Sequence, residues 1–270
     1  MASELDVEAP AGMPSILRLL DLEYIEEDIY RSRAVFKDTN RLFGGQVAGQ
    51  ALYAAGRTVP EGRMPHSLHG YFLRQGDAQR PTVFRVERDR DGNSVSNRRV
   101  VAIQAGKVIF NLSTSFAVAR PGSGDEEPEP PEAPDLPSPD SLPGWTPSRF
   151  TSFEIRSERP DEMTSQFWVR CTVDLPDDPL LHAAVLAYTS DMSSGLIGMH
   201  PPGTYSGASM DHAVWFHRPF RADRWIWQDL AGQTVAAGRG LYTGGIYAED
   251  GTRIASTAQE ALFMRHRARG

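Results

Sequence analysis

Residues 43–52 read FGGQVAGQAL and begin the segment that decides the fold. The apolar side chains of residues 43–58 recur with helical spacing, at Val47, Ala51, Leu52 and Ala55. Three glycines lie in the same segment, and each would cost an isolated helix roughly 1 kcal/mol; they are Gly44, Gly45 and Gly49. We expect this cost to be offset by close approach of the helix to a sheet.

The segments that follow this helix have the pattern of β-strands. They cover residues 66–74, 82–87, 95–104 and 108–118. Asp91-Gly92 and residues 105–107 supply turns between them. One helix followed by a run of antiparallel strands is an α+β arrangement, in which a sheet wraps around its central helix.

The second part of the chain repeats this order. Residues 166–173 alternate as a strand, and Asp178-Pro179 supplies an N-cap followed by proline at the first helical position. The helix is expected to end near Met192 or Gly195. Strands follow at residues 209–217, 234–242 and 252–264, with a hairpin turn at Asp250-Gly251. We therefore expect two copies of one unit; the alternative is that two unrelated α+β halves share this order.

Residues 121–147, between the two halves, differ in composition from the rest. They contain nine prolines and seven acidic residues, with few large apolar ones. Such a segment cannot bury enough surface to offset its ordering entropy, so it predicts an extended, solvated linker. The expected organisation is a first half over residues 14–120, the linker over 121–147 and a second half over 148–268.

Composition and charge exclude several classes of protein. The 270 residues are 40% hydrophobic and carry a net charge of −7, which allows two domains but not the basic surface of a nucleic-acid binder. Residues 1–13 lack the features of a signal peptide, and no stretch approaches the ~20 apolar residues of a membrane span. A single cysteine permits no intrachain disulfide. These features predict a cytoplasmic protein without a membrane span.

No familiar catalytic or cofactor motif occurs in the sequence. GxSxG, the Walker A loop, GxGxxG after a strand and HExxH are all absent. His66 and His69 have no third ligand nearby in sequence, which favours a structural role over metal binding. Cys171 lies on an apolar strand face and is expected to be a small buried hydrophobe. We predict neither a cofactor nor a metal site.

Three polar side chains are candidates for chemistry. Asp191 projects from the apolar face of the second helix near its C-terminus, where burial and the macrodipole should both raise its pKa; the alternative is a cap that bonds local backbone. Gln259 lies among apolar residues on a strand, where a buried amide needs a partner such as water. Ser209 begins a strand, where a serine is more often a simple turn residue.

Five blocks of sequence resemble the acyl-CoA thioesterase II family. They are residues 43–52, 66–74, 91–100, 211–220 and 255–260, and they occur in the family's order. The resemblance covers nearly all of residues 17–265, the linker excepted. It implies the double hotdog fold, in which two tandem antiparallel sheets each wrap around a helix, joined here by the proline-rich acidic linker.

The same resemblance implies a reaction and a catalytic set. Family members hydrolyse acyl-CoA to free fatty acid and CoA without a cofactor, using an Asp, a Thr or Ser, and a Gln that hold the hydrolytic water. The matching positions are Asp191, Ser209 and Gln259; many members carry Thr where this chain has Ser209. A homo-oligomer, dimer or tetramer, is implied as well.

Two other functions remain open from the sequence. A hotdog enoyl-CoA hydratase typically pairs an Asp with a His, and only His200 lies near Asp191 in sequence. A non-catalytic acyl-CoA binding protein would be favoured if the three polar side chains lay far apart. Three arginines could bind CoA phosphates: Arg74, Arg218 and Arg239.

Pairing the two halves suggests how many sites the chain has. Aligning Tyr71 with Trp215, and residue 106 with residue 251, puts Pro65 in the place of Ser209 and Thr114 in the place of Gln259. The first half has therefore not kept the set, and one active site per chain is expected.

Overall fold

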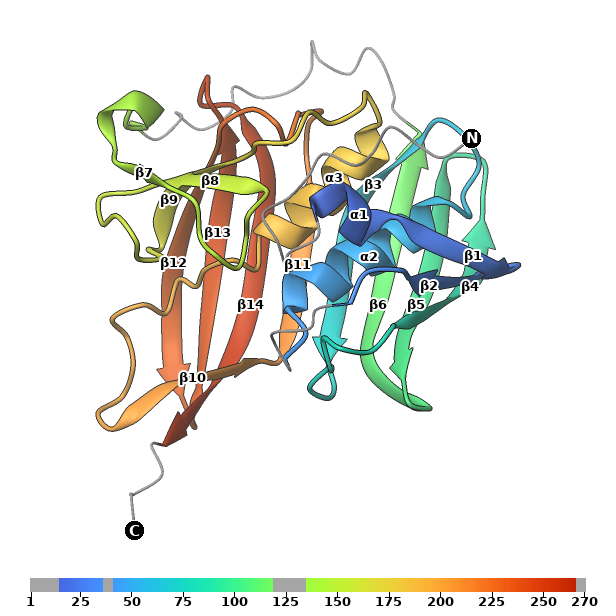
Figure 1. Ribbon diagram of the computed structural model, residues 1–270, viewed down its shortest axis with the longest axis horizontal. Coiled ribbons are helices and arrows are strands. Elements are labelled where there is room, and N and C mark those ends of the chain that lie inside the picture. Colours follow the sequence, from blue (N-terminus) through green and yellow to red (C-terminus); the bar gives the residue numbers. More distant parts are fainter. Residues whose placement is uncertain (1–14, 36–40, 119–134, 266–270) are drawn as a thin grey trace.

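The computed structural model describes residues 15–35, 41–118 and 135–265 (Figure 1). In the first half a short helix and a hairpin precede the predicted helix and its four strands. The elements are α1 (Ile16–Leu20), β1 (Leu22–Glu26), β2 (Ile29–Ser32), α2 (Gly44–Gly56), β3 (Arg63–Phe72), β4 (Val83–Asp91), β5 (Val95–Gln104) and β6 (Lys107–Val118).

The second half again has one long helix among antiparallel strands. Its elements are the 3₁₀ turn η2 (Pro139–Ser141), β7 (Gly144–Trp145), β8 (Phe153–Arg156), β9 (Gln166–Cys171), α3 (Pro179–Thr189), β10 (Thr204–Ser209), β11 (Asp211–Phe216), β12 (Ile226–Ala236), β13 (Arg239–Ala248) and β14 (Arg253–Arg265). Both predicted helices and their order among the strands are confirmed.

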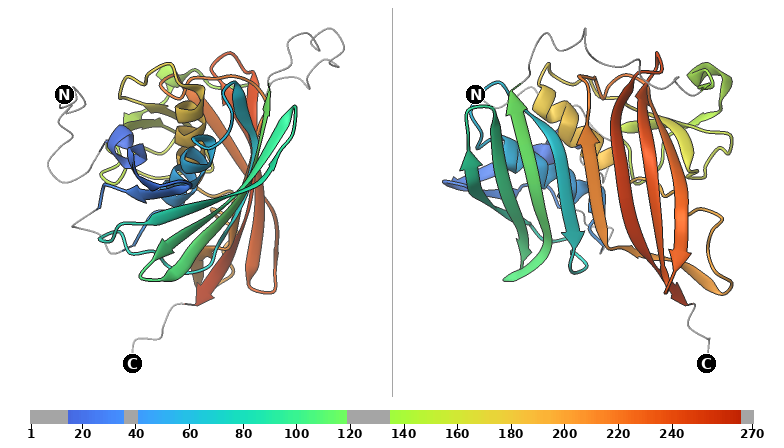
Figure 2. Two further views of the ribbon diagram at one scale, coloured as in Figure 1. Left: turned by 90° about the vertical axis from the view of Figure 1, so that its right-hand side faces the viewer. Right: turned by 180° about the vertical axis from the view of Figure 1, so that it is seen from behind.

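The expectation of two separate sheets is wrong. The strands form one 14-stranded sheet in the order β1-β2-β4-β5-β6-β3-β11-β14-β13-β12-β9-β8-β7, with β10 also paired to β14. The halves join where β3 and β11 run antiparallel, with Leu68 opposite Val214. Pairing these strands satisfies backbone groups that two separate sheets would leave exposed at their edges. Figure 2 shows the continuous, curved sheet from behind.

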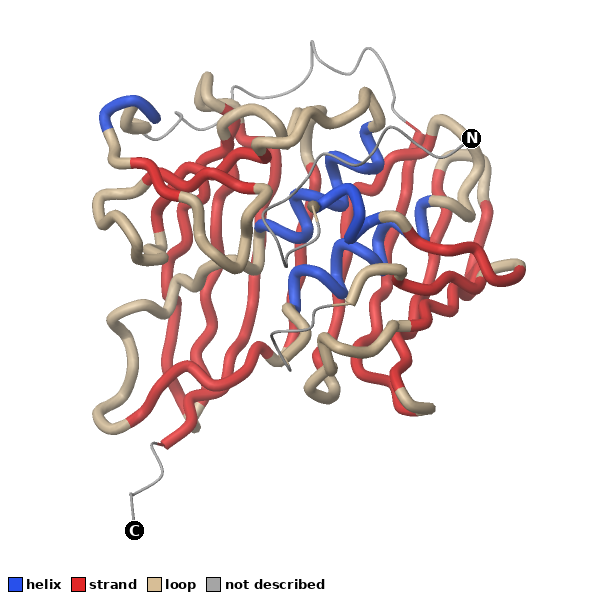
Figure 3. The backbone as a smooth tube through the Cα atoms, in the orientation of Figure 1, coloured by secondary structure: helices blue, strands red, loops and turns tan. Residues whose placement is uncertain are grey.

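Helices α2 and α3 lie together on the concave face of this sheet, as Figures 2 and 3 show. The glycines of α2 allow this contact, because a Cβ on Gly45 would lie 2.2 Å from the Tyr188 carbonyl oxygen and one on Gly49 would lie 2.7 Å from that of Ala184. The expected partner of the glycines was a sheet. The observed partner is the backbone of the other helix, so the residues that allow α2 to form also bring the two halves together.

One predicted strand is wrong. Residues 234–242 span the end of β12, a turn and the start of β13. Ala237 and Gly238 make this turn with φ of 48° and 76°. Ala105 and Gly106, where the sequence predicts a turn, have the same conformation at 46° and 74°. The missed turn therefore carried the same Ala-Gly signal.

The linker ends earlier in the structure than the predicted residue 147. Residues 119–134 lie outside the described residues, but β7 pairs with β8, so the sheet begins before residue 148. Leu136 and Leu142 pack against a cluster of three tryptophans, whose Trp168 donates its indole N–H to the Pro137 carbonyl at 2.9 Å. Apolar residues between the prolines therefore bind this stretch to the second half.

Candidate active site

Asp191 lies two residues beyond Thr189, the last residue of α3, so the helix ends earlier than the predicted Met192 or Gly195. The helix begins where predicted, because the Asp178 carboxylate accepts the N–H of Leu180 at 2.9 Å and Pro179 occupies the first helical position. Nearly all of its side chains are buried, and Ser190 forms its C-cap. Asp191 is thus carried by the C-terminal end of a buried helix and is itself partly exposed.

The N-terminus of α2 meets the Asp191 carboxylate. The N-cap of α2 is Phe43, whose side chain makes no capping hydrogen bond. The backbone N–H of Gly45, the second residue of the helix, instead donates to Asp191. Asp191 therefore caps a helix of the other half. A Cβ on Gly44 would lie 2.5 Å from Asp191 Oδ2, so this approach requires glycine.

The structure brings the other two predicted residues to Asp191. Gln259, on β14, donates from Nε2 to Ser209 Oγ at 2.5 Å, and its side chain also hydrogen-bonds to the Asp191 carboxylate. Ser209 is the last residue of β10 and pairs with Ala261 of β14, which places it beside Gln259 on the sheet. Three side chains distant in sequence thus form one connected group.

The pKa of the Asp191 carboxyl is raised mainly by burial, which disfavours its charged form. The positive end of α2, through the Gly45 N–H, acts in the opposite direction, as do Gln259, His212 and Arg149. The predicted direction is confirmed, but the opposing helix end was not foreseen. A carboxylate that is desolvated yet hydrogen-bonded is a suitable general base.

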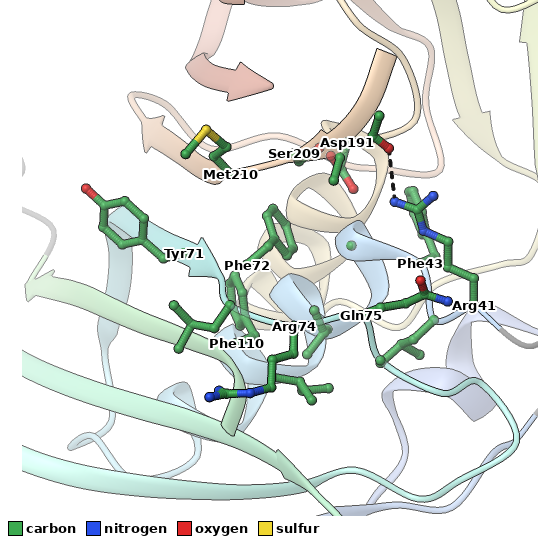
Figure 4. Close-up of a pocket in the computed structure, with 18 of the residues that line it drawn as sticks. Arg41, Phe43, Tyr71, Phe72, Arg74, Gln75, Phe110, Asp191, Ser209 and Met210 are labelled. Carbon is green, nitrogen blue, oxygen red and sulfur yellow. Dashed lines mark hydrogen bonds between the residues drawn. The ribbon is translucent and has the colours of Figure 1, made fainter. Parts of the chain in front are cut away.

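A pocket of about 710 Å³ opens beside this group. Figure 4 shows Asp191 and Ser209 together on one wall, with Phe43, Phe72 and Phe110 on the others. Gln259 is only 4% exposed and stands behind Asp191 and Ser209 rather than lining the pocket. The arginines in the lining are Arg41, Arg74 and Arg149, and Arg41 donates to the Gly207 carbonyl at 3.3 Å (Figure 4). Apolar walls beside arginines suit a ligand with an apolar end and an anionic end.

Comparison with known families identifies the chain. Residues 34–117 match the model of the acyl-CoA thioesterase N-terminal domain, and residues 121–263 match that of the acyl-CoA thioesterase C-terminal domain. The chain belongs to the acyl-CoA thioesterase family. It is accordingly a thioester hydrolase.

Named relatives and solved structures agree with this family. The chain is 33% identical to human acyl-coenzyme A thioesterase 8, over 95% of this chain and 91% of that protein. It is 32% identical to acyl-CoA thioesterase 2 of Haemophilus influenzae, over 92% and 96%. The crystal structure of the acyl-CoA thioesterase II TesB2 from Mycobacterium marinum is 41% identical, with a TM-score of 0.80 over 94% and 99% of the two chains. A hot dog fold protein from Alicyclobacillus acidocaldarius, 18% identical with a TM-score of 0.74, shares the fold.

His212 is a member of this acyl-CoA thioesterase's polar group that the sequence did not reveal. It is fully buried on β11, with Nδ1 2.5 Å from Gln259 Oε1 and Nε2 2.8 Å from Ser190 Oγ. Burial lowers its pKa, although the charge of Asp191 opposes this. His212 belongs to one of the blocks that resemble the family, but only the pairing of β11 with β14 brings it to Gln259.

A histidine therefore does approach Asp191, although none does so in sequence except His200. Both ring nitrogens of His212 already have partners inside the protein, and His212 does not line the pocket. A hydratase acid or base would have to present a ring nitrogen to its substrate. The contact therefore does not have the geometry of an Asp–His catalytic pair.

The three arginines proposed from the sequence differ in position. Arg74 lines the pocket and donates to the Val108 carbonyl at 2.7 Å. Arg239 forms an ion pair with Glu260, and Arg218 donates to the Arg253 carbonyl; neither lines the pocket. Only Arg74 of the three is therefore near the candidate site.

Other expectations concern metal, membrane and cysteine. Across the described residues, no three His, Cys, Asp or Glu side chains are grouped as a metal site would need. No helix in the same part of the chain has the length and apolar character to cross a membrane. Cys171 is a buried free thiol in the core, as predicted, and burial raises its pKa to about 12.

Proposed function

We propose that this chain hydrolyses acyl-CoA thioesters to free fatty acid and CoA, with a water held and activated by Asp191, Ser209 and Gln259. One observation carries the proposal. The Asp191 carboxylate, whose pKa is raised by burial, lies in the wall of the pocket and shares Gln259 with Ser209. The printed names of the relatives supply the acyl-CoA substrate.

In the proposed reaction, Asp191 accepts a proton from the water while the water oxygen attacks the thioester carbonyl carbon. A water between Asp191 and Ser209 would lie near the Gln259 amide that bonds both, and fixed partners lower the entropy cost of attack. The tetrahedral intermediate then collapses, the carbon–sulfur bond breaks, and the CoA thiolate takes up the proton that Asp191 accepted from the water. Asp191 is regenerated as the carboxylate.

The N-terminus of α2 is our candidate for stabilising the oxyanion. Gly44 lines the pocket, and the first N–H groups of a helix lack partners within it. They lie at the positive end of the macrodipole, where negative charge is favoured. The Gly45 N–H is already used by Asp191, which leaves its neighbours in the first turn for the substrate.

We assign the fold as a double hotdog in which the second half carries the reacting groups and the first half shapes the pocket. The pocket supports this division, because it takes Phe72 and Phe110 from the first half and Ser209 and Leu262 from the second. The apolar walls would hold the acyl chain, and Arg74 is near enough to be tested as a contact for CoA.

The first experiment measures release of free thiol from acyl-CoAs of increasing chain length by the purified protein. Wild type should turn over part of the panel, while Asp191→Asn should not. Ser209→Ala should lose activity and Ser209→Thr should keep it, because threonine retains the hydroxyl. Near-wild-type activity in Asp191→Asn would reject the assignment.

Two further outcomes address the other functions. If no acyl-CoA is hydrolysed but acyl-CoA binds, measured by calorimetry, the chain is a binding protein. Hydration of an enoyl-CoA, followed by loss of its absorbance, would favour the hydratase. A homo-oligomer in the cytoplasm is part of the proposal, and light scattering of the purified protein would give its mass.

A further inference from the structure

The orientation of the Gln259 side chain is central to the site, because its two ends differ chemically. An amide offers N–H donors at one end and a carbonyl acceptor at the other, and the two ends have nearly the same shape. An ionised carboxylate only accepts, so Asp191 requires the N–H end of Gln259. Ser209 does not choose between them, because a hydroxyl can donate or accept.

The far end of Gln259 must then be the carbonyl oxygen, and it faces His212. Gln259 Oε1 lies 2.5 Å from His212 Nδ1, so Nδ1 must carry a proton. Burial lowers the pKa of His212 and keeps the ring neutral, which leaves Nε2 without a proton. Ser190 Oγ lies 2.8 Å from Nε2 and 3.2 Å from the Ala187 carbonyl oxygen. In this tautomer its single proton goes to the nearer Nε2, for which the described residues offer no other donor.

A continuous chain of hydrogen bonds follows, running from Ser190 through His212 and Gln259 to Asp191. Ser190, His212 and Gln259 are 0%, 0% and 4% exposed, so no bulk water can replace a missing partner. Two charged groups act on His212, namely Asp191 and Asp211, and both favour its protonation.

We propose that His212 is a positioning residue for hydrolysis: held as the Nδ1–H tautomer by Ser190, it locks Gln259 with its N–H groups toward Asp191 and Ser209. This inference rests on the proposed function for its kinetic consequences, but not for the tautomer itself. Without the lock, the amide can rotate and present Oε1 to the Asp191 carboxylate, which removes a donor and adds repulsion.

The first half shows what this position contains when no such lock is needed. The strand pairing that sets Ala213 opposite Ala258 sets His69 opposite Ser113 in the first half. On that register, Leu68 takes the place of His212 and Thr114 that of Gln259. Thr114 donates to the Ser67 carbonyl at 2.9 Å and has no amide to orient.

Two variants at His212 separate positioning from packing. His212→Leu installs the first-half residue and removes the donor to Gln259. His212→Asn places its amide N–H where Nδ1–H lies and keeps the donor. In His212→Leu we expect kcat/KM at neutral pH to fall roughly tenfold to a hundredfold, as for a lost hydrogen bond to a charged group. KM should change little, because His212 does not line the pocket.

The pH profile is a readout that packing alone would not move. The acid limb of kcat/KM reports the general base of the free enzyme. Losing a donor raises the pKa of Asp191, so in His212→Leu the limb should move upward by roughly one pH unit. In His212→Asn the limb should stay at its wild-type position. No shift in His212→Leu, or equal shifts in both variants, would overturn the proposal.

The tautomer can be measured without any activity. Two-bond nitrogen–proton correlation spectra of ¹⁵N-histidine-labelled protein distinguish protonated from bare ring nitrogens, and the spectrum of His212→Asn assigns the His212 signals. We expect a neutral ring protonated at Nδ1 near neutral pH. An Nε2–H tautomer or an imidazolium would overturn the lock, even if the chain hydrolysed acyl-CoA.

Failure of the proposed function would look different. The wild-type protein would then release no thiol, while its ring would still be protonated at Nδ1. If His212→Leu does not fold, Ser190→Ala carries the test, because removing the donor to Nε2 frees the tautomer. Its acid limb should shift in the same direction by less, and an unchanged limb would count against the proposal.

Discussion

The two halves of the chain place opposite charges at equivalent helix ends. Asp191 lies two residues beyond the end of α3, and Thr58 lies two residues beyond the end of α2. Tyr242 of β13 pairs with Gln259, and Arg98 of β5 pairs with Thr114, in the matching places of the sheet. A partly exposed carboxylate therefore follows the end of α3, while a buried guanidinium from β5 binds the residue that follows the end of α2.

Arg98 makes the first-half position a closed structural unit. Its side chain is fully buried, donates to the hydroxyl and carbonyl of Thr58 at 2.8 and 3.0 Å, and bonds both carboxylate oxygens of Asp91. A cation at a helix C-terminus is favoured by the macrodipole. Every interaction of Arg98 thus stabilises the fold, and none is available to a ligand.

Asp191 has the reverse balance. Its negative charge is disfavoured by burial and by the C-terminus of α3, and it is held by the N-terminus of α2 and by Gln259. The second half therefore keeps a carboxylate in an unfavourable setting, which is what a general base requires. Equivalent helix ends in the two halves thus serve different purposes: the end of α2 is closed by a cation that stabilises the fold, and the end of α3 holds an anion suited to chemistry.

The largest predicted effect is the loss of activity on neutralising Asp191, which separates a catalytic role from a stabilising one. Asp191→Asn should lower kcat/KM by about 10²–10⁴-fold, the usual contribution of a general base. Stability should be kept or should rise by a few degrees in melting temperature, because asparagine can still cap α2 and no charge is buried. Thiol release and calorimetry measure the two. The control is Thr58→Val, which should leave kcat unchanged.

Arg98→Met should show the opposite pattern. Methionine leaves the buried Thr58 hydroxyl and carbonyl without the donors that Arg98 supplies, and each such unsatisfied group costs about 1–3 kcal/mol, so the denaturation midpoint should fall. The turnover of the remaining folded protein should be close to that of wild type, because Arg98 does not line the pocket. A large loss of kcat with unchanged stability would show that Arg98 serves the active site rather than the stability of the fold.

The two ends of α2 should also respond differently to added bulk. Gly45→Ala would place a methyl group against the backbone carbonyl of Tyr188, and overpacking of this kind costs about 1–3 kcal/mol. Because it also displaces the N–H that Asp191 accepts, activity should fall. For Gly56→Ala the nearest atoms belong to the side chain of Leu180, which can move. Urea denaturation should show a clearly smaller change for Gly56→Ala.

The sequence predicted features that depend on local pattern. The cap at Asp178, both long helices, the four strands that follow α2 and the buried free thiol all follow from spacing and composition; β1 and β2 were not predicted. The grouping of Asp191, Ser209 and Gln259 was expected from the resemblance, and their catalytic roles stay predictions.

Features that depend on contacts between elements far apart in the sequence were missed. Nothing in residues 43–45 says that their amides will face a carboxylate from α3, and nothing near His212 says that strand pairing will set it beside Gln259. The single sheet has the same cause, because the pattern of β3 is equally compatible with an edge strand. Only the shared turn signal at residues 237–238 could have been read from the sequence.

The smallest predicted effect is a difference in the pH dependence of stability between two aspartates. The pKa of Asp191 is raised by burial, so its native state holds a proton more tightly than the unfolded chain. The stability this contributes is present below the unfolded pKa and is lost as the pH rises through the folded one. Asp91 is the reverse: the hydrogen bond from Ser96 and the contact with Arg98 lower its pKa, so its contribution is present above the unfolded pKa and is lost as the pH falls.

Urea unfolding of Asp191→Asn and Asp91→Asn against wild type, from acid to neutral pH, measures both. The differences in unfolding free energy should have opposite slopes, and slopes of the same sign would show that the two helix ends do not hold their charges in opposite balance.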